Sequence, residues 1–121
     1  MEEPTQKSIW NMDDAVLKTI SLLKTSFLIY LKEWELDRAY WILREIRAET
    51  ESKFKEAEQK ELEEDIKKLE DIRKKYLENK EKRGEFFIEL EKFSIKLNRL
   101  MKKHGLYFRE GINIRKAVHN R

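Results

Sequence analysis

Histidine is the side chain best suited to acid–base and metal chemistry at neutral pH, and this sequence contains two, His104 and His119. A carboxylate-bridged metal site in a helical bundle needs Glu three residues before His on the same helix. Met101 and Lys116 stand at those two positions, and the chain has no Cys that could serve as a thiolate ligand or nucleophile. A glycine-rich phosphate-binding loop is also absent from the sequence. We therefore expect neither a metal site nor a cofactor.

A second group of residues that could carry out chemistry lies just before Gly105. It consists of an arginine, an apolar residue, three further residues and a histidine, in the order Arg99-Leu100-Met101-Lys102-Lys103-His104. This order resembles the signature of the HEPN ribonucleases, a family of small all-helical proteins. The resemblance implies that Arg99 and His104 would act on an RNA phosphodiester in a site formed by two subunits. Because the pair stands at the end of an expected helix, the alternative is a solvated Arg99 and a His104 that belongs to a C-terminal cap.

Positive charge is concentrated at the C-terminal end of the chain. Residues 102–121 contain six cations and one acid, which gives +5, so the other 101 residues carry −2 of the total charge of +3. Cations neutralise phosphates, and aromatic side chains stack on unpaired bases. The sequence therefore predicts a segment that binds RNA or DNA through Lys102, Lys103, Tyr107, Phe108, Arg109, Arg115, Lys116 and Arg121. The alternative is a solvated or self-docked tail.

The composition of the whole chain favours a single helical domain. Of its 121 residues 42% are charged, and 27 Lys and Arg nearly balance 24 Asp and Glu. One Pro and three Gly are too few for the many turns of a β architecture. We find neither the apolar core of a signal peptide nor a stretch that could span a membrane. We expect a cytoplasmic protein with no membrane partner. The abundance of Lys and Glu and the absence of Cys favour a thermophilic source organism.

Apolar residues that recur every three or four positions predict three helical segments. The first covers residues 12–33 and follows a polar arm at 1–10. The second covers 36–83, with a break expected near 49–52 and a stop expected at Gly84. The third covers 85–104 and carries a heptad stripe of the coiled-coil type. Together they predict an all-α fold of antiparallel hairpins in a helical domain at 11–105, followed by the basic tail at 106–121.

The apolar stripes of the first and third segments are wider than one neighbouring helix can cover. We therefore expect a homodimer in which a helix of the second copy completes the helical bundle. The function that we expect is that of a non-enzymatic interaction or assembly protein that touches nucleic acid through its basic tail. Two alternatives stay open. One is a metal-independent ribonuclease that uses Arg99 and His104, and the other is a purely protein-binding accessory protein of a virus or plasmid, with a partner unknown from the sequence.

Overall fold

The computed structural model describes the backbone of residues 2–106 and the side chains of residues 15–106. Within this range the chain forms α-helices, short 3₁₀ turns and no strand, which confirms the all-α prediction. The elements in chain order are α1 (Glu2–Lys32), α2 (Leu36–Thr50), η1 (Glu51–Lys53), α3 (Glu56–Glu78), η2 (Lys80–Lys82) and α4 (Arg83–Lys103).

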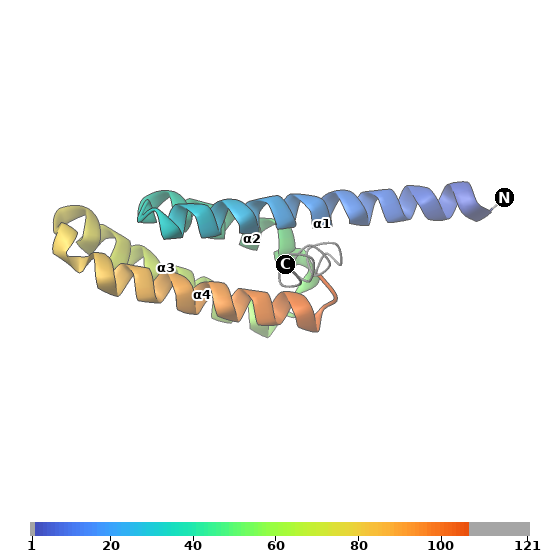
Figure 1. The fold of residues 1–121 in the computed structure, drawn as a ribbon. Helices are drawn as coiled ribbons and strands as arrows, with labels where there is room; N and C mark the ends of the chain where they lie inside the picture. The colour runs from blue at the N-terminus through green and yellow to red at the C-terminus, as the bar shows by residue number, and fades with distance from the viewer. Residues whose placement is uncertain (1, 107–121) are drawn as a thin grey trace.

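The helices form two antiparallel hairpins, α1–α2 and α3–α4, which lie one above the other (Figure 1). Helix α2 connects the two hairpins because it packs against both α1 and α4. At 1.5 Å per residue, α1 is about 46 Å long and α2 only about 22 Å. The N-terminal half of α1 therefore extends past the end of α2 and past the α3–α4 hairpin (Figure 1).

One apolar core joins all four helices, and each helix contributes the residues of one face. Tyr40 of α2 and Phe86 of α4 are fully buried in this core, with ring centroids 6.3 Å apart, and Tyr76 of α3 packs on Phe86 at 5.2 Å. The heptad stripe expected in the last helix is buried at Phe86, Leu90, Phe93 and Leu97. Each large side chain of this kind contributes about 1.5–3 kcal/mol by leaving water. The spacing of apolar residues thus determines which face of each helix turns inward.

The first helix begins earlier than expected. Residues 2–10, expected as a polar arm, continue α1 to its start at Glu2. Pro4 does not prevent this because it falls in the first helical turn, where backbone N–H groups have no partner within the helix.

The segment expected at 36–83 is divided into two helices at residues 51–55. Helix α2 ends at Thr50, a buried residue whose hydroxyl donates a hydrogen bond to the Ile46 carbonyl at 2.9 Å. Helix α3 starts after Lys55, whose backbone N–H donates to the Glu58 carboxylate at 2.8 Å. A Glu three residues after the N-cap residue of a helix is the acidic half of a capping box. The sequence prediction overlooked this cap because Lys is not a usual N-cap residue.

The stop expected at Gly84 lies at Asn79 instead. Asn79 has an extended backbone, and its side-chain oxygen accepts a hydrogen bond from the Glu81 N–H at 3.0 Å, which ends α3 and starts η2. Gly84 is consequently the second residue of α4. The other expected glycine stop is present: Gly105 has a φ of +75°, and the Leu106 N–H donates to the Met101 carbonyl at 2.7 Å. This is the Schellman ending that a glycine after a helix favours.

Candidate functional site

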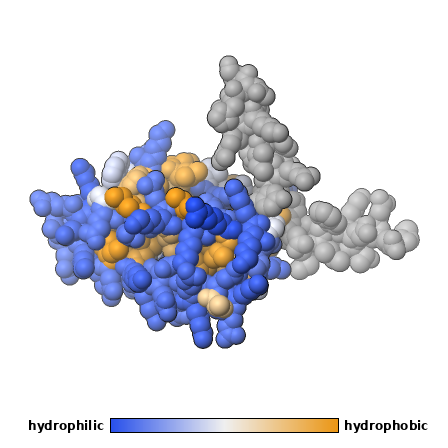
Figure 2. Space-filling model, turned by 90° about the horizontal axis from the view of Figure 1, so that it is seen from below, coloured by the Kyte–Doolittle hydropathy of each residue, from blue (hydrophilic) through white to orange (hydrophobic). Residues whose placement is uncertain are grey.

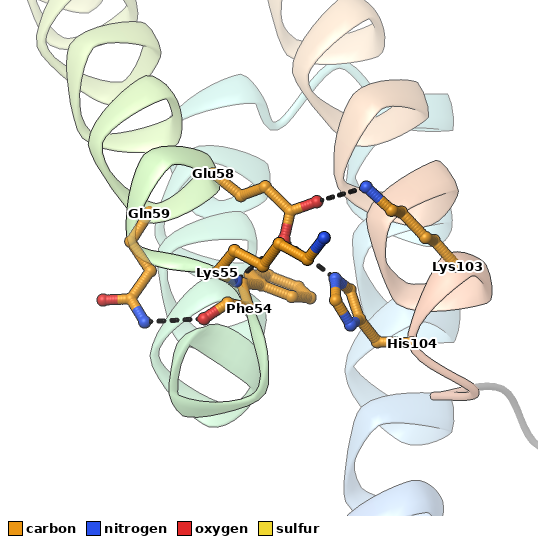
Figure 3. Close-up of polar contacts among 6 residues, drawn as sticks. All are labelled: Phe54, Lys55, Glu58, Gln59, Lys103 and His104. Carbon is orange, nitrogen blue, oxygen red and sulfur yellow. Dashed lines mark hydrogen bonds and ion pairs between the residues drawn. The ribbon is translucent and has the colours of Figure 1, made fainter.

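His104 lies at the C-terminal end of α4 and is tied to the beginning of α3. Its Nε2 is 2.8 Å from Oε1 of Glu58, and its ring packs against Phe54 with centroids 5.5 Å apart (Figure 3). Its side chain is only 19% exposed. The prediction that His104 belongs to a helix end agrees with this position, since its own backbone N–H caps the last turn.

Glu58 is the centre of this group of side chains. Besides His104, its carboxylate accepts hydrogen bonds from Lys103 Nζ at 2.8 Å and from the Lys55 backbone N–H at 2.8 Å (Figure 3). The hydrogen bond from Lys103, followed by that from Lys55, lowers the pKa of Glu58 from 4.5 to about 2, although partial burial acts in the opposite direction. A carboxylate with so low a pKa is a weak base at neutral pH. The arrangement is therefore suited to holding α3 against α4, and we call Glu58, Lys103 and His104 the Glu58 cluster.

Arg99, the other residue of the HEPN-like motif, lies elsewhere on α4. Its side chain is exposed, and no hydrogen bond or ion pair among the described residues joins it to His104. The structure of the single chain therefore does not bring Arg99 and His104 together. A site of the kind that the resemblance implies would have to combine residues of two subunits.

The predicted nucleic-acid segment begins at the end of α4. Lys102 and Lys103 are both exposed there, and Lys103 is engaged by Glu58. The other residues of the predicted segment lie outside the described part of the chain, namely Tyr107, Phe108, Arg109, Arg115, Lys116 and Arg121.

A second set of ion pairs joins α3 and α4 nearer the middle of the two helices. Lys96 Nζ of α4 lies 2.6 Å from Glu61 and 2.6 Å from Asp65 of α3. Burial alone would lower the pKa of Lys96, but hydrogen bonds to Asp65 and Glu61 outweigh it and raise the pKa. Between residues 15 and 106, no group of His, Asp and Glu side chains has an arrangement that could hold a metal ion.

An exposed tryptophan on α2 is flanked by two arginines that the sequence prediction did not single out. The guanidinium carbons of Arg44 and Arg73 lie 5.2 and 5.1 Å from the ring centroid of Trp41, within cation–π range. Arg73 also binds Asp37, so α3 is anchored to α2 at this point. Because Arg73 is more than 30 residues from Trp41 in sequence, only the packing of α3 on α2 reveals the group.

Large apolar side chains remain exposed on the outer faces of α1 and α4. On α1 they are Leu22 (70% exposed), Leu28 (60%) and Ile29 (54%), and on α4 they are Ile88 and Ile95 (51% each). Leu28 also lines a small pocket between α1, α2 and α4, together with Leu43 and Ile46 of α2. The view from the α3–α4 side shows a mostly hydrophilic surface with small, separate hydrophobic patches (Figure 2).

Comparison of the chain with protein-family models, with curated proteins and with solved structures finds no match. Among the described residues, no helix has both the length and the apolar character needed to cross a membrane.

Proposed function

We propose that this protein is a non-enzymatic helical assembly protein that acts by self-association. The observation that supports the proposal is the pattern of exposed apolar residues. A single exposed Leu or Ile is ordinary on a protein surface. Here, however, Leu22 and Ile29 on α1, like Ile88 and Ile95 on α4, are seven residues apart, so that each pair lies along one helix face. Such stripes are typical of surfaces that another helix covers.

The direct test of self-association is the molar mass of the full chain in solution, measured by light scattering over a wide range of protein concentration. We expect a mass above the 14.8 kDa of one chain, falling toward that value on dilution. A mass of one chain at every concentration would contradict the proposal.

We also propose that the basic C-terminal end binds nucleic acid through its phosphates. The support is the charge asymmetry of the sequence, +5 in residues 102–121 against −2 in the rest, together with the exposure of Lys102. Gel-shift titrations with RNA and DNA should show binding that weakens steeply with salt, because each neutralised phosphate releases counterions.

A triple variant tests which cations bind the nucleic acid. Replacing Arg115, Lys116 and Arg121 by Ala should weaken binding and flatten its salt dependence. The matched control removes three exposed cations of α3 instead, Lys67, Lys68 and Lys74. Equal losses in both triple variants would indicate a diffuse effect of net charge and would contradict a tail-specific site.

A further inference from the structure

One face of α1 carries apolar and charged residues in an order that matches the same face of a second, antiparallel helix. It comprises Lys18, Leu22, Thr25, Ile29 and Glu33, all of them exposed, and we call it the α1 outer face. It lies opposite the residues that α1 buries against the core, such as Ile20 and Phe27. Glu33 follows the last residue of α1, but its N–H still donates to the Ile29 carbonyl at 3.0 Å, so it continues the helical turn. The outer face thus forms one continuous row of about four turns.

We propose that a second copy of this chain packs antiparallel on the α1 outer face, with the two-fold axis between Thr25 and Ser26. This inference rests on the proposed self-association and specifies its geometry. In this register Leu22 of each copy lies opposite Ile29 of the other, because the two residues are equally far from the axis. A two-fold interface contains each contact twice, so two Leu–Ile contacts form around the small polar centre at Thr25.

The charges at the ends of the row fit the same register. Lys18 and Glu33 are also equally far from the axis and carry opposite charges. The antiparallel pair therefore places Lys18 of one copy opposite Glu33 of the other, at both ends of the apolar centre. A parallel pair would instead place Lys18 against Lys18 and Glu33 against Glu33. Complementary charges at the rim of an interface favour one orientation over the other.

The stripe on α4 does not offer an equivalent surface. Exposed Lys92 lies between Ile88 and Ile95 on the same face, four residues after one and three before the other. In an antiparallel pair of α4 helices the two copies of Lys92 would meet near the two-fold axis, where like charges repel. The neutral Thr25 at the corresponding place on α1 is the feature that favours α1.

Cysteine cross-linking tests the orientation cleanly because the chain has no Cys of its own. In the proposed pair, Thr25→Cys lies beside its counterpart at the axis and should form an intermolecular disulfide under mild oxidation. Lys18→Cys should not link to itself, because the two positions are about 22 Å apart along the helices, far beyond the reach of a disulfide. Cross-linking of both variants would indicate a parallel pair, and cross-linking of neither would place the interface elsewhere; both results would overturn the inference.

A charge exchange tests the register. Lys18→Glu and Glu33→Lys should each weaken the dimer, since each opposes like charges across the interface. The double variant should associate more tightly than either single variant, because opposite charges face each other again with their positions exchanged. A dimer that is indifferent to all three variants would overturn this geometry while self-association itself still held. A strictly monomeric wild-type chain would remove the proposed function as well.

Discussion

At the scale of single residues, the most informative position is Glu58. It caps the start of α3 through the Lys55 N–H and holds the end of α4 through Lys103 and His104. One carboxylate thus fixes two helix ends that are more than 40 residues apart in sequence. The loss of its charge should loosen both ends together.

The low pKa of Glu58 predicts how stability depends on pH. Its pKa in the folded chain, about 2, is below the ordinary value of 4.5, so at intermediate pH the unfolded chain binds a proton that the folded chain does not. The stabilisation by ionised Glu58 is therefore present above about pH 4.5 and is lost as the pH falls through about 2. Thermal melts should show Glu58→Gln less stable than wild type at neutral pH, with the two midpoints converging as the pH falls toward 2.

The matched control for this prediction is Glu63→Gln, which changes an exposed acid of the same helix that forms no ion pair with the described residues. Its melting temperature should differ little from that of wild type at every pH. A difference between Glu58→Gln and wild type that is constant with pH would contradict the role of the Glu58 charge.

The pairing of His104 with Glu58 also supports a structural role for this histidine over the ribonuclease alternative. We expect the wild-type chain to leave RNA intact without added metal. His104→Ala should reduce the melting temperature, because it removes the contacts with Glu58 and Phe54. Cleavage of RNA by the wild type that is abolished in Arg99→Ala and His104→Ala would instead favour the HEPN-like function.

At the scale of helices and turns, the apolar spacing predicted the buried faces, but the helix ends depend on polar contacts that the spacing does not contain. Asn79 ends α3 with its side chain, whereas Gly84, the expected stop, is accommodated within α4. The ion pairs between α3 and α4 could not be predicted, because they depend on how Glu58, Glu61 and Asp65 face Lys103 and Lys96 after packing. Residue spacing along one helix carries no information about that register.

Gly84, inside the first turn of α4, and Gly105, just after its end, should respond to alanine in opposite ways. Gly84→Ala should stabilise the fold by up to about 0.5–1 kcal/mol, since the position is helical and an added methyl group would meet no atom within 4 Å apart from its chain neighbours and the backbone of its own helix. Gly105→Ala should destabilise it by about 1–2 kcal/mol, because its φ of +75° disfavours any residue with a side chain. Urea unfolding of both variants measures the difference, and the same sign of effect for both would contradict these helix boundaries.

At the scale of the whole molecule, the sequence predicted an all-α fold and apolar stripes too wide for the chain's own helices to cover. The structure leaves part of both stripes exposed, at Leu22, Leu28 and Ile29 on α1 and at Ile88 and Ile95 on α4. The regular spacing includes Ile20 and Phe27, which are buried, but it does not show whether the apolar residues beside it, such as Leu22 and Ile29, are covered by another helix of the chain. Only the packing of α2 against α1 shows which side of α1 stays exposed.

Sedimentation equilibrium of two matched variants tests whether two copies associate through the α1 outer face. Ile29→Glu and Ile88→Glu introduce the same charge at isoleucines of nearly equal exposure, 54% and 51%, on different helices. Both should keep the helical circular dichroism of the wild type, because neither side chain is buried in the core. We predict that Ile29→Glu sediments as a monomer while Ile88→Glu keeps the mass of the wild-type dimer. A dimer that survives Ile29→Glu, or one that is lost in Ile88→Glu alone, would contradict association through the α1 outer face.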